Sequence, residues 1–157
     1  MNWEGETPIL DWHIAGWVAA MLSTPHETMS PIGSLPTGRD LIAQVRSGLG
    51  IDIIDAVLTE GWLTLTELDG IVLPRKTLSH RRKLGILTPD QSDRLARVAR
   101  IIVMARDTFG EDAKAKLWLR RPTTALDGES PLQILDTDQG AREVEILLGR
   151  ISHGIAA

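Results

Sequence analysis

The sequence predicts an all-α protein, with a helix-turn-helix DNA-binding part followed by a small helical C-terminal domain. Apolar residues recur at spacings of three and four along most of the chain after residue 38. Glycine and proline divide these segments into lengths typical of globular helices. Around residue 75, a short helix and a tight turn precede a helix rich in Lys, Arg, Ser and Thr, which is the layout of a helix-turn-helix DNA reader.

The composition is that of a globular protein of one domain or two small ones. Of its 157 residues, 43% are hydrophobic and 24% charged, which is close to ordinary usage. Cysteine is absent, so disulfides and thiolate metal sites are excluded and a reducing cytosol is favoured. No apolar run approaches the ~20 residues of a membrane span, and the Met1–Glu6 segment is acidic where a secretory signal would be basic. We therefore expect a soluble, cytoplasmic protein with no membrane partner.

The first 38 residues are predicted to form an N-terminal helix and a linker. Pro8–Leu22 has the pattern of a helix, and Ser23–Gly38 contains three prolines and two glycines, which favour a loop. We expect the tryptophans of the helical part to pack against the body of the protein or a second copy rather than to bind a ligand. These residues are Trp3, Trp12 and Trp17.

Two helices should follow the linker. Thr37–Gly48 carries apolar residues at helical spacing and ends in glycine, and Ile51–Glu60 repeats the pattern before Gly61. A strand over Gly50–Ile54 is the alternative for the start of the second segment, although the acids within and beside it disfavour a strand.

The helix-turn-helix is predicted between residues 64 and 83. Thr64 or Thr66 can cap its first helix, in which Leu65, Leu68 and Ile71 are expected to face inward. The second helix, Arg75–Lys83, contains five Lys or Arg in nine residues, and His80 lies among them.

Positive charge is concentrated around this segment although the net charge of the chain is -4. The stretch Arg75–Arg106 holds nine Lys or Arg against two acids, whereas the remainder holds eight against nineteen. A local excess of this kind is the electrostatic signature of a phosphate-binding surface, and a solvated helix face is the plainer alternative. The preceding helix-turn signal favours the phosphate-binding interpretation.

The longest helix should run from Thr88 to about Phe109. Thr88 can cap it, Pro89 suits its first position and Gly110 should end it. Its apolar stripe consists of Leu95, Val98, Ala99, Ile102 and Phe109. A basic face formed by Arg94, Arg97 and Arg100 is expected to hold phosphates.

Three shorter helices are predicted in the C-terminal part. Ala113–Arg121 should be anchored by Leu117 and Trp118. Ser130 should cap the second helix, with Pro131 at its first position. The third should begin at Thr137 or Asp138 and continue to His153-Gly154.

Motifs of enzymatic chemistry are missing. The chain contains no phosphate-binding loop, nucleotide-binding glycine pattern, nucleophile elbow or His-Glu-x-x-His pair. The four histidines are scattered, and Asp11 with His13 is the one weak pair of possible metal ligands. We therefore expect no catalytic residues, no metal and no cofactor.

An ordered series of motifs links the chain to a known family. In chain order these are Thr77-Leu78, Arg81-Arg82, Gly85-Ile86-Leu87-Thr88, Trp118-Leu119, Leu126-Asp127-Gly128-Glu129-Ser130-Pro131-Leu132, Leu135-Asp136-Thr137-Asp138-Gln139-Gly140 and Leu148-Gly149-Arg150-Ile151-Ser152-His153-Gly154. The series resembles the Xre/MbcA/ParS antitoxins of RES–Xre toxin–antitoxin modules. The resemblance extends from about Arg39 onward and is closest between Glu67 and Gly154.

The resemblance implies a function and an organisation. Members of the family pair a Xre/Cro-like helix-turn-helix with a helical toxin-binding region, neutralise a RES-domain toxin that depletes NAD by covering its active site, and repress their own operon. The expected partners are thus a cognate RES toxin and operator DNA, with the chain in a homodimer or a larger complex with the toxin. The expected divisions are residues 1–38, the DNA-binding and dimerisation region 39–109, and the toxin-binding domain 110–157.

The resemblance also assigns residues to the two surfaces. On the DNA-reading helix it implies Arg75, Lys76, Thr77, Ser79, His80, Arg81 and Arg82. By their chemistry, Arg81 or Arg82 suits a bidentate contact with guanine, and Lys83 is expected to hold a phosphate beside them. On the toxin-binding region it implies Trp118, Leu126, Gly128, Pro131, Leu132, Leu135, Thr137, Gly140, His153 and Gly154. We further expect Ser130 of the same motif series and the charged residues Arg120, Arg121, Asp127 and Arg150 to belong to this surface. Leu148 and Ile155 are further possible apolar contacts. Leu132 and Leu135 can instead belong to the core, and Asp127-Gly128 and Thr137 can be turn and cap.

Two points stay open at the level of sequence. Relatives commonly have glycine in the helix-turn-helix turn, where this chain has Val72. A β-branched residue disfavours positive φ, so the turn geometry is unsettled. The alternative function is a stand-alone helix-turn-helix repressor whose C-terminal helices dimerise.

Overall fold

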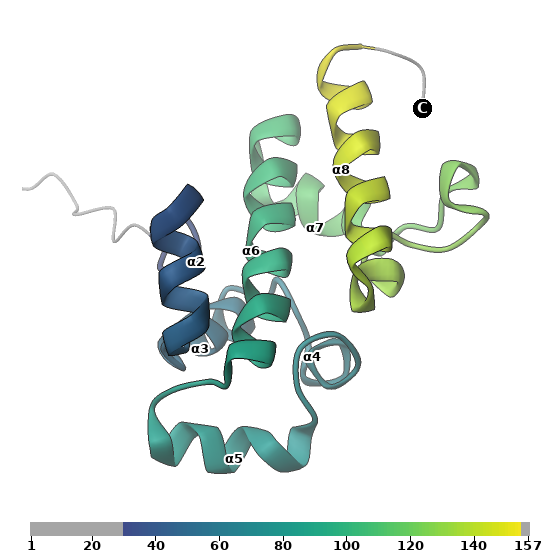
Figure 1. The fold of residues 1–157 in the computed structure, drawn as a ribbon. Helices are drawn as coiled ribbons and strands as arrows, with labels where there is room; N and C mark the ends of the chain where they lie inside the picture. Colours follow the sequence, from purple (N-terminus) through teal and green to yellow (C-terminus); the bar gives the residue numbers. More distant parts are fainter. Residues whose placement is uncertain (1–29, 155–157) are drawn as a thin grey trace, which may run out of the picture.

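The computed structural model describes residues 30–154, which form seven α-helices and two short 3-10 helices (Figure 1). In chain order these are α2 Gly38–Ser47, α3 Asp52–Thr59, α4 Leu65–Ile71, α5 Arg75–Leu84, α6 Pro89–Phe109, α7 Asp112–Arg120, η1 Thr124–Leu126, η2 Gln133–Asp136 and α8 Asp138–Ser152. The expected all-α class is confirmed, and over this range the β pairing is one isolated bridge between Gly50 and Ile86. The helix predicted over Pro8–Leu22 lies outside the described residues.

The central element is α6, which stands between α2 on one side and α8 on the other (Figure 1). Its predicted bounds are confirmed. Thr88 forms a capping box with Gln91, Pro89 occupies the first turn, and Gly110 ends the helix in the left-handed conformation. The expected apolar stripe is buried except at its end, where Phe109 is half-buried. Because α6 contacts α2, α7, α8 and η2, one helix supports both halves of the described chain.

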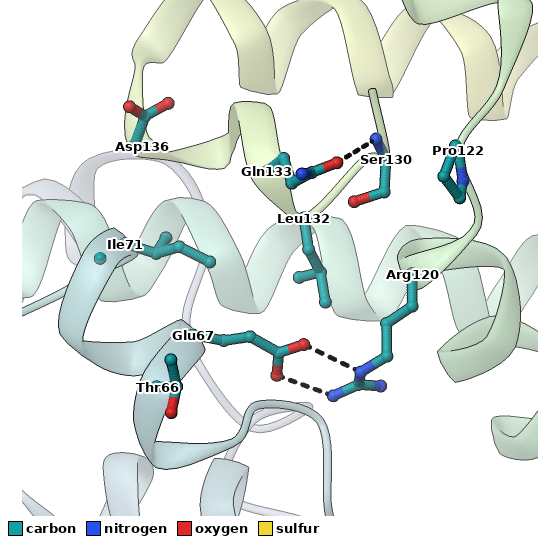
Figure 2. Close-up of a pocket in the computed structure, with 10 residues that line it drawn as sticks. Thr66, Glu67, Ile71, Arg120, Pro122, Ser130, Leu132, Gln133 and Asp136 are labelled. Atoms are coloured by element: carbon teal, nitrogen blue, oxygen red, sulfur yellow. Dashed lines mark hydrogen bonds and ion pairs between the residues drawn. The ribbon is translucent and has the colours of Figure 1, made fainter. Parts of the chain in front are cut away.

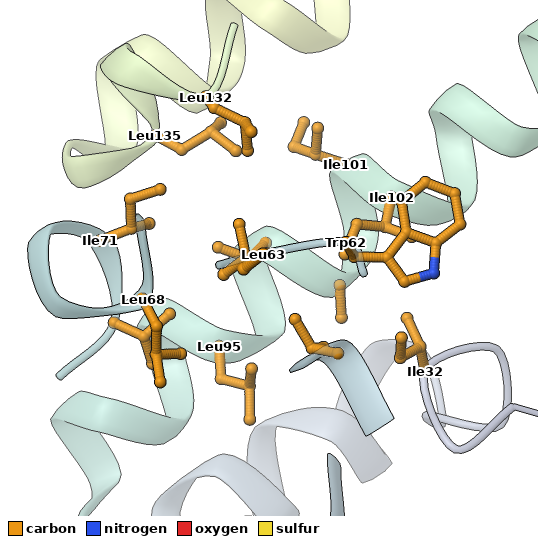
Figure 3. Close-up of a cluster of buried hydrophobic side chains, with 14 of the residues drawn as sticks. Ile32, Trp62, Leu63, Leu68, Ile71, Leu95, Ile101, Ile102, Leu132 and Leu135 are labelled. Atoms are coloured by element: carbon orange, nitrogen blue, oxygen red, sulfur yellow. The ribbon is translucent and has the colours of Figure 1, made fainter. Parts of the chain in front are cut away.

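The core is continuous across these two halves. Trp62 is fully buried and belongs to a hydrophobic cluster that includes buried residues of every described α-helix except α2. Figure 3 shows Leu132, which precedes η2, and Leu135, which lies within it, pointing toward Ile71 of α4 and Leu63. Leu132 and Leu135 are therefore core residues, as the alternative interpretation of the sequence allowed.

The helix-turn-helix consists of α4 and α5. Thr64, rather than Thr66, caps α4 in a capping box with Glu67. Val72 has φ -108° and ψ -61°, a right-handed conformation that β-branched residues adopt readily, so the turn needs no glycine. The backbone N–H of Arg75 donates to the Asp69 carboxylate, which fixes the start of α5 against α4.

The segment between α2 and α3 pairs with the loop between α5 and α6. The amide of Leu87 donates to the carbonyl of Leu49 at 2.9 Å, and the amide of Ile51 donates to that of Gly85 at 3.1 Å. A Cβ at Gly48, whose φ is 101°, would lie 2.5 Å from the Leu87 carbonyl oxygen. The strand alternative for residues 50–54 is wrong, because α3 begins at Asp52 and the extended pairing is limited to this bridge.

Three expectations about side chains and helix type are corrected. Leu65 is 41% exposed and Leu117 is 71% exposed, so neither faces inward. Ala115 and Leu119 anchor α7 instead, while Trp118 packs against Phe109 with ring centroids 5.4 Å apart. The helix predicted after Ser130 is only the 3-10 helix η2, which begins at Gln133 and has no side-chain cap, so Ser130 and Pro131 precede it instead of opening it.

The final helix agrees with its prediction. It begins after Thr137, whose side chain accepts a hydrogen bond from the Gly140 amide at 3.0 Å, and it ends at Ser152. Its buried residues pack toward α6. Within residues 30–154, no helix combines the length and apolar character needed to cross a bilayer.

Candidate functional site

The outer face of α5 carries an unobstructed polar stripe. Figure 1 shows α5 crossing one end of the molecule, and Leu78 is the residue that anchors it to the core. Lys76, Ser79, His80 and Lys83 are exposed and follow the spacing i, i+3, i+4, i+7, so they share one face of the helix. Exposed donors on one helix face can contact phosphates and the edges of bases in a groove.

The two arginines expected to read guanine lie beside this stripe. The Nη2 of Arg82 lies 2.6 Å from Oδ1 of Asp55 in α3, and its Nε donates to the same oxygen at 3.1 Å. Arg81 is half-buried, and its Nε is buried without a hydrogen-bond partner. Neither arginine therefore projects as freely as Lys76 and Lys83, which form no ion pair within residues 30–154.

The arginine row of α6 has intramolecular partners. Arg94 pairs with Asp90 on its own helix. Arg97 is only 12% exposed and lies between Asp93 and Asp138, while Arg100 pairs with Glu145 of α8. The expectation that this row holds phosphates is therefore not supported for Arg97 and Arg100, which join α6 to α8.

The residues expected to bind a toxin divide into a structural and an exposed group. Ser130 and Leu135 are buried, and a Cβ at Gly140 would overlap the Ile134 carbonyl. Thr137 caps α8, and the ring of Trp118 packs at a tilt against that of Phe109. Leu148, the possible apolar contact, is also buried, and Ile155 lies outside the described residues. The exposed group includes Arg121, Asp127, Thr137, Arg150, His153 and Gly154, so Thr137 is exposed although it also caps α8.

A cleft of about 610 Å³ separates α4 from the C-terminal part (Figure 2). It is lined by Thr66, Glu67, Gly70, Ile71, Arg120, Pro122, Ser130, Leu132, Gln133 and Asp136. Across it the Arg120 guanidinium donates to both Glu67 carboxylate oxygens, each at 2.9 Å, and to the Trp62 carbonyl at 3.1 Å. Arg120 thus ties α7 to the first helix of the helix-turn-helix, a contact that the sequence did not indicate.

Glu67 has two structural roles, in the capping box of α4 and in the ion pair with Arg120. Burial raises the pKa of its carboxyl, but the hydrogen bonds from Arg120 and Thr64 and the charge of Arg120 outweigh that penalty. The pKa of Glu67 is therefore lowered from its ordinary value. The charged form of Glu67 stabilises the folded protein.

The contribution of Glu67 should disappear in acid. A lowered folded pKa gives stability that is present above about pH 4.5 and is lost as the pH falls through the folded pKa. Relative to the wild type, Glu67→Gln should reduce the free energy of unfolding by about 1 kcal/mol near neutral pH. Urea unfolding should show this difference shrinking as the pH is lowered from neutral to below about 4.5.

The exposed pair of Glu111 and Lys114 provides the control. The Nζ of Lys114 lies 3.3 Å from Oε2 of Glu111, and both side chains are well exposed. Glu111→Gln should therefore change the free energy of unfolding little, at neutral or at acid pH. A Glu67→Gln difference that is the same at both pH values would show that its charge does not stabilise the fold.

The fold and the basic helix together define a class of protein. A capped α4, a right-handed turn and an α5 with an exposed basic stripe form a helix-turn-helix, and α6 joins it to a second helical region. The chain is therefore a helix-turn-helix protein with an additional C-terminal helical domain.

Comparison with known proteins identifies the family. Residues 40–100 match the Antitoxin Xre-like helix-turn-helix domain, and residues 104–154 match the Antitoxin Xre/MbcA/ParS C-terminal toxin-binding domain. The chain is 36% identical over 126 residues to Antitoxin Xre of Yersinia enterocolitica, covering 77% of this chain and 85% of that protein. It is 36% identical over 129 residues to Antitoxin Xre of Pseudomonas putida, and the match covers 82% of this chain and 80% of that protein. The chain belongs to the Xre antitoxin family, which confirms the resemblance seen in its motifs.

Proposed function

We propose that this chain neutralises a RES-domain toxin that depletes NAD, by covering the toxin's active site, and that it represses its own operon. The observation that carries the proposal is the tandem match of a helix-turn-helix and a toxin-binding domain, in this order, over nearly all of the described residues. DNA binding and toxin binding then belong to separate surfaces of one protein.

The DNA-binding function is proposed for the residues of α5, within a DNA-binding and dimerisation region that comprises residues 39–109. The exposed stripe from Lys76 to Lys83 is the part of α5 best placed to enter a major groove, and lysine can donate to the O6 and N7 atoms of guanine. Arg75 lies at the start of the same helix, where it can contact the DNA backbone. One such helix reads only a few base pairs, so we expect two copies of the chain on a two-fold repeated operator.

The toxin-binding function is proposed for residues 110–157. Of the residues assigned from the motifs, those that a partner can reach are the exposed group defined above. The buried residues Ser130 and Leu135 hold this surface in place from the core, and the exposed Thr137 also fixes the start of α8.

Co-expression with the neighbouring reading frame tests the proposal. Growth, NAD level and co-purification should be scored together, alongside the shift of a promoter fragment of the same operon. Rescue of a growth-arresting, NAD-depleting neighbour with a stable complex and a shifted promoter is the expected result. A harmless neighbour that does not co-purify, with the promoter still shifted, would favour the stand-alone repressor.

A further inference from the structure

One large apolar side chain on the outer face of α8 is exposed to solvent. The inner face of this helix buries Ala141, Val144, Leu147 and Leu148. On the opposite side, Ile146 is 57% exposed and stands between the charged residues Glu143 and Arg150. Removing the apolar surface of such a side chain from water is favourable, and in this position only a binding partner can cover it.

A hollow of about 200 Å³ adjoins Ile146. Its walls are formed by Ala125 and Leu126 on one side and by Glu143, Ile146, Leu147 and Arg150 of α8 on the other. The volume suits one medium-sized side chain rather than a small-molecule ligand, for which pockets of roughly 300 Å³ or more are usual. The hollow therefore fits a protein partner that inserts a single residue.

The loop that forms one wall of the hollow is held in a defined shape. Five backbone hydrogen bonds connect residues 123–129, among them Thr123 to Glu129 at 3.1 Å and Gly128 to Thr123 at 3.0 Å. Asp127 within this loop has φ 53°, and it is the one non-glycine residue with positive φ between residues 30 and 154. Aspartate tolerates this conformation in turns, and here it closes η1. Because this loop already has a defined shape, it loses less conformational entropy when a partner binds.

The charges at the hollow are also available to a partner. Arg150 and Glu143 form no ion pair within the described residues, whereas the neighbouring Arg142 pairs with Asp138 at 3.0 Å. Protein interfaces commonly have an apolar centre with charged residues at the rim, and a few residues near the centre supply most of the binding energy. The hollow, with Ile146 at its centre and Arg150 and Glu143 at its edge, has this arrangement.

We propose that this hollow, with Ile146 and Arg150, is the docking site of the toxin. An apolar side chain of the toxin enters between Leu126 and Ile146, and a neighbouring carboxylate of the toxin pairs with Arg150. The inference rests on the proposed function for the existence of a toxin partner, and residues 104–154 match a toxin-binding domain. Leu117, the other strongly exposed apolar residue of this region, lies on α7 and does not line the hollow.

Point variants of the full chain test the site. The affinity for the purified toxin of the same operon should be measured for the wild type, Ile146→Glu, Arg150→Glu and Leu117→Glu. We expect Kd to rise about 100-fold for Ile146→Glu and about tenfold for Arg150→Glu, because truncating or reversing a central contact has effects of this size. Leu117→Glu, which places the same charge on a position that is more exposed still, should stay within about threefold of the wild type.

Each outcome separates the docking site from the proposed function. A wild type that does not bind the toxin overturns both. Tight binding by the wild type together with wild-type affinity in Ile146→Glu, or an equal loss in Leu117→Glu, overturns the docking site alone. Thermal melting and promoter binding report on folding, and if Ile146→Glu melts early, Ile146→Ala takes its place with an expected loss of about tenfold.

Discussion

Replacing Gly140 with alanine is expected to lower the free energy of unfolding by about 3 kcal/mol or more, which corresponds to roughly 10 °C in Tm. A Cβ at this position would lie 1.9 Å from the carbonyl oxygen of Ile134 and 2.8 Å from its carbonyl carbon. Both atoms belong to the backbone, so no side-chain rotation can relieve the overlap. Either η2 or the first turn of α8 must move, and η2 places Leu135 in the core. Thermal melting and urea unfolding measure the loss.

Gly149 provides a matched control in the same helix. Nothing lies within 4 Å of a Cβ built there, so Gly149→Ala adds only the higher helix propensity of alanine. This change should stabilise the protein by roughly 0.5–1 kcal/mol. Opposite signs for the two substitutions would show that Gly140 is required by the packing of η2 against α8. If both substitutions changed the free energy of unfolding by equally small amounts, the backbone around Ile134 and Gly140 would be able to move at little cost.

Gly140 also illustrates why a motif does not by itself locate a contact surface. It was expected to bind the toxin because it belongs to the motif series of the family. In the structure it allows two segments of the same chain to approach closely. Leu135 and Ser130, from the same series, are likewise buried. A residue that a fold requires and one that a partner contacts leave the same signal in a sequence.

Local signals predicted the helices well. The capping Thr88, the following Pro89 and the terminal Gly110 act within one turn of each end of α6, so the sequence alone defined its bounds. The inward face of the short helices was harder to predict. Leu65 and Leu117 are exposed because a helix of two turns offers few apolar positions, and packing with distant segments decides which of them is buried.

Contacts between distant residues were beyond a single sequence. Arg82 meets Asp55 across 27 positions, and Arg120 meets Glu67 across 53. Local periodicity carries no information on such pairs. These ion pairs nonetheless distinguish the basic side chains, since Arg82 and Arg120 have partners within the chain whereas Lys76 and Lys83 are exposed without an ion pair among the described residues. The basic character of α5 was predicted from sequence, and its accessible face required the structure.

The double variant Lys76→Glu and Lys83→Glu is expected to weaken promoter binding by at least about 100-fold and to reduce the dependence of affinity on salt. The two lysines lie seven residues apart on one exposed face of α5, so both can contact phosphates or bases in the same groove. Losing two phosphate contacts should reduce the slope of log K against log salt by roughly two, because fewer counterions are released on binding. Fluorescence anisotropy with a promoter fragment at several salt concentrations measures both quantities.

The control for this variant changes the net charge of the chain by the same amount at a different place. Lys114→Glu with Arg121→Glu reverses two exposed charges on and beside α7, whereas α5 and its stripe stay intact. If α5 is the DNA-reading helix, this control should keep near wild-type promoter affinity and an unchanged salt slope. The α5 variant should in turn keep its affinity for the toxin, because the proposed docking site on α8 is untouched. An equal loss of promoter binding in both double variants would mean that overall charge, and not a surface on α5, governs binding to DNA.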